Sequence, residues 1–214
     1  MNKSSLILLA FITGCASLPD NTPTHYLQSE NINPPTQETF PHCYNYGCKN
    51  VVYTVLSDEE WRNIDALFAP PIKNAQDERS RISQSIALFE TYVGARTGTE
   101  VDGYGTFRNM GNFHHDCVDE STNTTVYLMM LRDRGLIKHH TLSAPDTRFP
   151  LINGGRWPHK TAVIRDTQTH ERYAVDSWFH DNGFPAEVIS MNSWKKGWKP
   201  EENFERGSDS NPHK

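Results

Sequence analysis

The segment 116–135 constrains the fold of this chain more than any other. Asp116 is a favourable N-cap residue, and two further acidic residues in the first turn match the positive end of a helix dipole. Residues 127–131 are apolar on every side of a helix. The pattern therefore predicts a helix that begins at Cys117, ends near Gly135 and is buried in the middle of the domain.

Two further helices are predicted before this segment. Ser57 and Glu60 have the spacing of a capping box, which indicates a helix that ends before Pro70. A second helix is predicted over residues 76–96, where apolar residues recur at steps of four, three and four: Ile82, Ile86, Phe89 and Val93. This single apolar stripe indicates packing against a core. The glycine-rich segment 98–112 predicts a loop that leads to residue 116.

A β-hairpin is predicted after the central helix, with strands at 157–164 and 171–179. If the chain turns about the Thr167–Gln168 bond, His159 lies directly opposite Asp176. Opposed side chains share a face of the sheet, with Cβ atoms ~4.5–5.5 Å apart. A slip of one residue would place the two on opposite faces. Helices combined with an antiparallel sheet predict an α+β domain.

The four cysteines have different expected roles. Cys43 and Cys48 are close enough to form a small disulfide loop, which an oxidising compartment permits. Zinc binding by this pair is disfavoured, because no second pair of ligands follows nearby. Cys15 ends a short apolar leader. Cys117 is left as an unpaired thiol, which suggests a reactive group in an exported protein.

The N-terminus has the features of a bacterial lipoprotein signal. A positive residue precedes a short apolar run, so residues 1–14 predict a signal peptide and not a membrane span. Residues 12–15, Ile-Thr-Gly-Cys, resemble the lipobox, in which the cysteine is lipidated. That resemblance implies acylation of Cys15, and Ala16 after it favours the outer membrane, with the protein facing the periplasm.

Composition divides the rest of the chain. Residues 15–40 are polar and rich in proline, which predicts a flexible tether, and residues 201–214 predict a disordered tail. The folded domain is therefore expected over residues 41–200.

The formal net charge of the whole chain is −5, which disfavours nucleic acid as a partner. The lipid anchor is the expected link to the membrane.

The position of Cys117 predicts opposing effects on its thiol. The positive end of a helix dipole favours the thiolate, which is the form that attacks carbonyl carbon. The neighbouring Asp116 and Asp119 favour the neutral thiol. A histidinium is therefore expected to supply most of the activation. His159, oriented by Asp176, is the histidine that the predicted hairpin offers.

At these residues the chain resembles the bacterial transglutaminase-like cysteine proteinases of the papain-like superfamily. In that family a cysteine opens a central helix, and a histidine and an aspartate follow on successive strands. The matching segments are 116–119 (Asp-Cys-Val-Asp), 159–163 (His-Lys-Thr-Ala-Val) and 173–176 (Tyr-Ala-Val-Asp). The resemblance covers residues 113–178 and implies a papain-like core.

The same resemblance implies a role for each residue. Cys117 would be the nucleophile, His159 the general base and then acid, and Asp176 the residue that orients it. The oxyanion donors would be the backbone N–H of Cys117 and a side chain such as Asn112. The implied activity is hydrolysis of a protein or cell-wall peptide through a thioester. We expect neither cofactor nor metal; calcium-using members carry an acidic residue where this chain has Val118.

Three other interpretations remain open at this point. An NlpC/P60-type cell-wall endopeptidase also begins a helix with its cysteine, although that family has Asp-Cys-Ser-Gly at the position of residues 116–119. A lipoprotein with this fold could act as a binding or scaffolding module without catalysis. A zinc site could also join Cys117 to the histidine pairs at 114–115 and 139–140.

Overall fold

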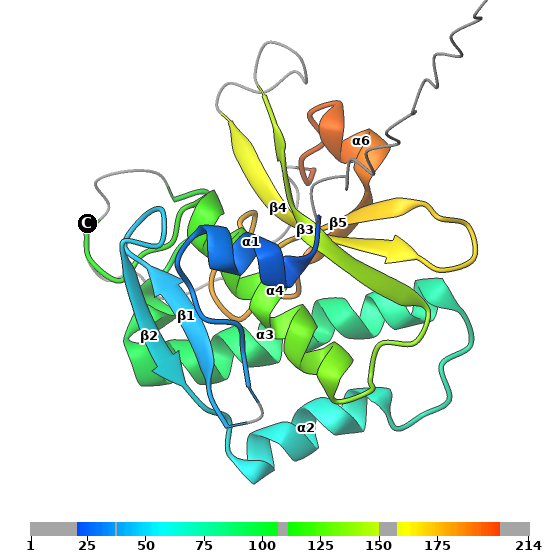
Figure 1. Cartoon of the computed structure of the whole chain (residues 1–214), viewed down its shortest axis with the longest axis horizontal. Coiled ribbons are helices and arrows are strands. Elements are labelled where there is room, and N and C mark those ends of the chain that lie inside the picture. The colour runs from blue at the N-terminus through cyan, green and yellow to red at the C-terminus, as the bar shows by residue number, and fades with distance from the viewer. Residues whose placement is uncertain (1–20, 37, 107–110, 150–157, 202–214) are drawn as a thin grey trace, which may run out of the picture.

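The computed structural model describes residues 21–36, 38–106, 111–149 and 158–201. These residues form an α+β fold with two antiparallel sheets, one ordered β1-β2 and the other β3-β4-β5-β6 (Figure 1). The elements in chain order are α1 (Pro23–Ser29), β1 (Phe40–Tyr44), β2 (Asn50–Thr54), α2 (Asp58–Phe68), α3 (Ala75–Thr97), η1 (Thr99–Val101), α4 (Cys117–Asp133), β3 (His140–Arg148), β4 (His159–Asp166), β5 (Arg172–Asp176), β6 (Glu187–Ser190) and α6 (Met191–Lys195).

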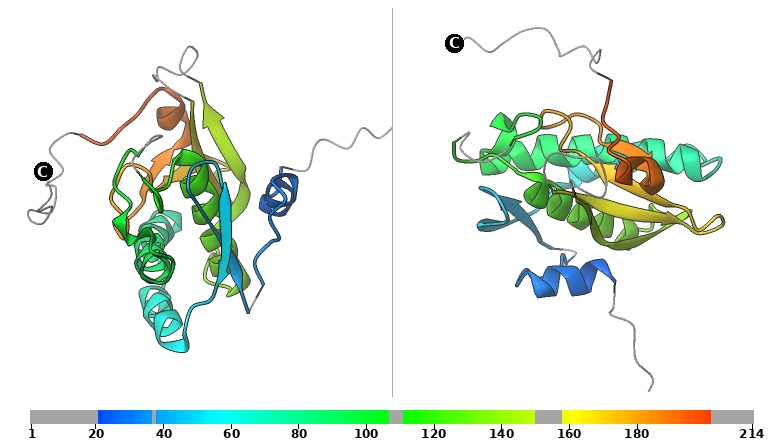
Figure 2. Two further views of the ribbon diagram at one scale, coloured as in Figure 1. Left: turned by 90° about the vertical axis from the view of Figure 1, so that its left-hand side faces the viewer. Right: turned by 90° about the horizontal axis from the view of Figure 1, so that it is seen from above.

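Helix α4 lies at the centre of the molecule, as its apolar pattern predicts. It packs on β4 of the larger sheet and on β1 of the smaller one. Figure 2 shows α2 and α3 on one side of α4 and α1 on the other. The side chains of Val126, Tyr127, Leu128 and Leu131 are buried in the core. A helix enclosed on all sides has little solvent face, which explains why its sequence lacks a polar stripe.

The two helices before α4 agree with the sequence prediction. Ser57 and Glu60 form the capping box, with the Ser57 N–H donating to Glu60 Oε2 at 2.7 Å and the Glu60 N–H donating to Ser57 Oγ at 3.3 Å. The predicted stripe of α3 is fully buried. Gly98 ends α3 with φ +79°, a conformation that glycine adopts without steric cost.

The predicted hairpin is present, but its register differs by two residues from the prediction. In the structure Ala162 pairs with Val175 and Ile164 pairs with Tyr173. The turn is therefore centred one residue later than expected. Asp166 Oδ1 accepts the N–H groups of Gln168 and Thr169, which fixes this turn. A two-residue difference preserves the face of every side chain.

The folded domain begins earlier than predicted. Within the expected tether, α1 and the segment after it pack on the domain and bury Tyr26, Leu27 and Ile32. The N-terminal end is also joined to the larger sheet, because the Ala144 N–H donates to the Asn21 carbonyl at 3.0 Å. The sequence prediction overlooked these apolar residues among the prolines. Among the helices that the structure describes, none combines the length and apolar character needed to cross a bilayer.

The β1–β2 hairpin carries the expected disulfide between Cys43 and Cys48. Its loop has an unusual backbone, because the four residues 45–48 all have positive φ. Consecutive left-handed residues turn their N–H groups toward one side, where they form an anion-binding concavity. Carboxylates at the start of α4 occupy that position in this structure.

Candidate active site

Cys117 is the first residue of α4 and the free cysteine among the described residues. Asp116 caps the helix, because its Oδ1 accepts the N–H groups of Val118 at 2.9 Å and Asp119 at 3.0 Å. The Cys117 side chain is 8 % exposed. Its sulfur lies 3.9 Å from the carbonyl oxygen of Pro158, the residue that precedes His159.

The disulfide loop holds the first turn of α4 in place. Asp119 accepts the N–H groups of Tyr46 at 2.8 Å and Cys48 at 2.6 Å. Asp116 accepts the N–H of Gly47 at 3.1 Å. These hydrogen bonds satisfy the two carboxylates beside Cys117 and join the left-handed loop to the helix that carries the thiol.

His159 and Asp176 are in contact despite the shifted register. His159 Nε2 lies 2.8 Å from Asp176 Oδ2. If the register of the β4–β5 pair is extended, Asp176 lies opposite Thr161. His159 is two residues from Thr161 on the same face, so the Asp176 side chain contacts it diagonally. Asp176 Oδ2 also accepts the indole N–H of Trp194 at 2.7 Å. All three side chains are buried.

The second ring nitrogen of His159 has no such partner. Nδ1 is buried and forms no hydrogen bond, which is rare for a buried polar atom. Aromatic rings surround the imidazole, with centroids of Trp178 at 4.6 Å, Phe179 at 5.4 Å and Trp194 at 5.6 Å. These rings exclude water from the bond to Asp176, and a dry environment strengthens that interaction.

The thiol of Cys117 is protonated at neutral pH in this structure. Burial raises the pKa of Cys117 to about 11, and the carboxylates of Asp116 and Asp176 act in the same direction, while the backbone N–H of Lys160 opposes them. Pro158 and Lys160 flank His159 in the chain, so the sulfur lies against the backbone on both sides of that histidine. The thiolate favoured by the helix dipole is not the resting form.

A buried guanidinium completes the surroundings of the site. Arg148 on β3 pairs in register with His159, and its Nη1 donates to the carbonyls of Trp194 at 2.8 Å and Trp198 at 2.9 Å. The guanidinium carbon lies 4.8 Å from the centre of the Trp194 ring. Sequence reasoning missed Arg148 and Trp194, because neither belongs to a recognisable local pattern.

The remaining predicted site residues have different outcomes. Asn112 is exposed and forms no hydrogen bond with the described residues, so the structure gives no support to it as an oxyanion donor. Cys15 and the predicted cleavage site lie outside the described residues. The zinc alternative is not supported, because the two histidine pairs contact different carboxylates. His114 and His115 contact Asp102, whereas the 139–140 pair contacts Glu78.

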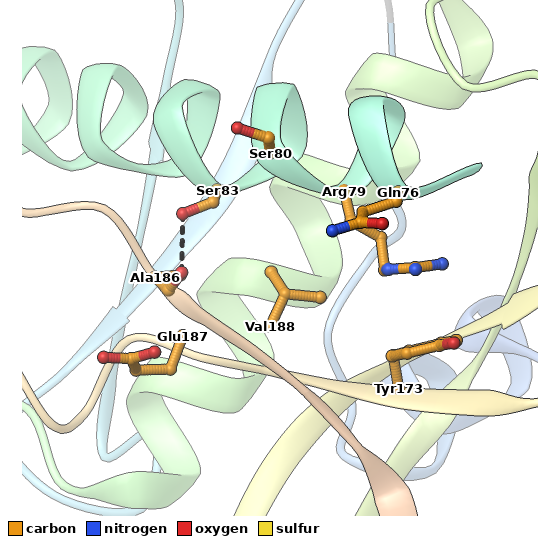
Figure 3. Close-up of a pocket in the computed structure, with 8 residues that line it drawn as sticks. All are labelled: Gln76, Arg79, Ser80, Ser83, Tyr173, Ala186, Glu187 and Val188. Carbon is orange, nitrogen blue, oxygen red and sulfur yellow. Dashed lines mark hydrogen bonds between the residues drawn. The ribbon is translucent and has the colours of Figure 1, made fainter. Parts of the chain in front are cut away.

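A separate pocket of about 330 Å³ lies between α3 and strands β5 and β6 (Figure 3). Its lining is mostly polar, and Ser83 Oγ donates to the carbonyl of Ala186 at 2.6 Å across one side of it. Cys117, His159 and Asp176 are not among its lining residues. The pocket is therefore distinct from the site around the thiol.

Comparison of the chain with protein-family models, with curated proteins and with solved structures finds no match.

Proposed function

We propose that this protein is a cysteine hydrolase of the transglutaminase-like group, with a papain-like core and a Cys117–His159–Asp176 triad. The observation that carries the proposal is the state of the His159 ring. Its Nε2 is fixed by buried Asp176, and its buried Nδ1 has no partner. General-base activation requires this nitrogen to come within hydrogen-bond reach of the thiol. The Cys117 sulfur contacts the Pro158 carbonyl beside His159, but the described structure has no hydrogen bond between the thiol and Nδ1.

The proposed reaction begins from the neutral thiol. As the sulfur attacks the amide carbonyl carbon, its proton passes to His159 Nδ1, and Asp176 stabilises the imidazolium. The tetrahedral intermediate collapses when His159 returns the proton to the leaving amine, which leaves a thioester on Cys117. Water, deprotonated by His159, then attacks the thioester and releases the carboxylic acid and the thiol.

The oxyanion requires at least one hydrogen-bond donor. The first N–H groups of a helix have no partner within the helix. The Asp116 side chain accepts the N–H groups of Val118 and Asp119. We therefore assign the N–H of Cys117 as the donor that stabilises the oxyanion. Exposed Asn112 has no part in this assignment.

Hydrolysis of peptide amides is the activity that this arrangement supports best. Nothing in the described site specifies a second amine acceptor, so transfer is disfavoured relative to hydrolysis. Together with the lipobox resemblance at Cys15, the proposal places a peptidase or amidase at the outer membrane, facing the periplasm. Protein and cell-wall peptides are the substrate classes that meet such an enzyme there.

An activated ester tests this proposal without knowledge of the natural substrate. Incubation of the full chain with p-nitrophenyl acetate should release nitrophenolate and add the mass of one acetyl group to the peptide that contains Cys117. The acetyl group should then be lost on removal of the ester. His159→Ala should slow acetylation, and Cys117→Ala should abolish it. Asp65→Asn, at an exposed ion pair with Arg134, is the control.

A non-catalytic binding module is the second candidate, and one observation favours it. The thiol is buried and its pKa is raised to about 11, as expected for a cysteine that only packs. In that case the folded protein would not be acetylated at Cys117, and His159→Ala would leave the labelling of Cys117 unchanged. Either result would reject the hydrolase proposal.

A further inference from the structure

A buried polar cluster lies beneath the start of α4 and has no part in the triad. Asp102 follows η1, His115 precedes the α4 cap, and Glu120 lies in the first turn of α4. All three side chains are buried. One ligand-type atom from each lies within 4.8 Å of those from the other two.

The geometry within this cluster is unusual for hydrogen bonding alone. His115 Nδ1 lies 3.1 Å from Asp102 Oδ2 and 3.0 Å from Glu120 Oε1. A single N–H shared between two carboxylate oxygens makes a weaker bond to each than an N–H aimed at one. Neighbouring ligands of a metal ion with bonds of ~2.1 Å and octahedral geometry are separated by about 3 Å, which matches the two distances from His115 Nδ1.

Surrounding groups orient each of the three side chains. His115 Nε2 lies 3.3 Å from His42 Nε2, and the His115 backbone N–H donates to Asp102 Oδ1 at 2.9 Å. Ser177 Oγ donates to Glu120 Oε2. Hydrogen bonds to the far atoms of carboxylates and imidazoles are typical of the outer shell around a metal.

An independent observation comes from Glu90 on α3. This side chain is 6 % exposed, and its Oε1 is buried without a hydrogen-bond partner. The other oxygen accepts the N–H of Gly183 at 3.0 Å. The carboxylate lies beside Ser177, the same residue that holds Glu120, and it interacts electrostatically with Glu120 and His115. A buried carboxylate oxygen without a partner is costly unless the group is protonated or a positive group faces it. Burial, with Glu120 acting in the same direction, raises the pKa of Glu90.

We propose that Asp102, His115 and Glu120 bind one divalent transition-metal ion, with Glu90 as a neighbouring buried carboxylate outside this set of three ligands. A nitrogen ligand favours zinc, manganese, iron(II) or cobalt over calcium and magnesium, which prefer oxygen. The ion would brace the loop before Cys117 against the first turn of α4.

Metal titration of the full oxidised chain tests this site. After dialysis against a chelator, addition of Co²⁺ should give visible absorption bands that saturate at one ion per chain. Zn²⁺, Mn²⁺ and Co²⁺ should raise the melting temperature, whereas Ca²⁺ and Mg²⁺ should not. Cys117→Ala should bind Co²⁺ equally, which excludes the thiol as a ligand. Because the readouts are spectra and melting, they do not depend on the proposed hydrolase activity.

Two variants separate metal binding from folding. Glu120→Gln should abolish Co²⁺ binding. Glu90→Gln should weaken it by about 10–100-fold, as loss of a group that supports the ligands does. Asp65→Asn should match the parent in both measurements. Absence of saturable binding and of a melting shift with all three transition metals would overturn the proposal, as would full Co²⁺ affinity in both cluster variants.

Discussion

A single oxygen, Asp176 Oδ2, receives both the His159 ring and the Trp194 indole. Two donors on one oxygen define the position of the carboxylate more narrowly than either alone. Trp194 comes from α6, which follows the strands that carry the other two residues. The end of the described chain therefore helps to orient His159.

Replacement of Trp194 by Phe tests this orienting role. The variant keeps an aromatic ring but loses the N–H to Asp176. Loss of a hydrogen bond to a charged group corresponds to roughly 1.5 kcal/mol, which is about tenfold in rate, so acetylation of Cys117 should slow by about that factor. Trp198→Phe is the matched control, since the described hydrogen bonds do not link Trp198 to Asp176 through its side chain. Equal acetylation rates in the two variants would show that the indole N–H has no orienting role.

At the scale of elements, Glu78 joins α3 to the start of β3. Its carboxylate accepts the N–H groups of Lys138 at 2.8 Å and His139 at 2.9 Å, and it lies 2.8 Å from His140 Nδ1. Burial alone would raise the pKa of Glu78, but these hydrogen bonds outweigh burial and hold the pKa below its ordinary value.

Glu78→Gln should therefore lower the free energy of unfolding at pH 7 by about 2–3 kcal/mol, as for a lost set of charge-assisted hydrogen bonds. A depressed folded pKa gives stability that is present above the ordinary glutamate pKa and is lost as pH falls through the folded value. The difference between parent and variant should shrink from pH 5 to pH 3 in urea unfolding. Glu201→Gln, at an exposed position, should show no difference at any pH. A gap that persists at pH 3 would contradict the role given to the charge.

Helices were more predictable from sequence than strands. Caps and apolar spacing located α2, α3 and α4 within a few residues, because those signals are local. β3, β6 and the β1–β2 pairing were not predicted, although each strand pairs with its neighbour along the chain. The burial of these strands does not alternate from residue to residue, so they lack the usual pattern of a half-buried strand. The hairpin register failed because the Asp166 turn and His170, at φ +61°, shift the reversal by one residue.

The candidate site was partly predictable, because some of its residues carry a signal that can be read along the chain. Cys117, His159 and Asp176 follow a recognisable order along the chain. The two-residue error in the predicted register did not change the face of the sheet that His159 and Asp176 share. Trp194, Arg148 and the Asp102 cluster depend on tertiary contacts between segments with no common local signal. Asn112 was chosen from its sequence position alone, and the structure leaves it exposed.

At the scale of the whole molecule, the segment 21–36, which contains α1, is part of the fold. Tyr26 hydroxyl lies 2.8 Å from Thr122 Oγ1 on α4, and Leu27 is fully buried. Burial of a large apolar side chain stabilises a fold by roughly 1.5–3 kcal/mol, a large share of the stability of a small domain.

Truncation tests where the folded unit begins. A chain without residues 1–20 should melt at the same temperature as the full chain. A chain without residues 1–36 should melt far lower or fail to unfold cooperatively, because it lacks α1. Circular dichroism during heating measures both. If the shorter chain melted like the full chain, α1 would be a peripheral attachment.

The central claim is that Asp176 acts through His159 on Cys117, and Asp176→Asn tests it most directly. The variant is nearly isosteric but removes the charge that stabilises the imidazolium, and loss of such a group in an analogous triad costs on the order of 10⁴ in rate. Acetylation of Cys117 by p-nitrophenyl acetate, followed by intact mass together with the melting temperature, should show a rate loss of that order with little change in stability. A variant that unfolds more readily while its folded fraction acetylates at the parent rate would show Asp176 to be structural, and would contradict the triad.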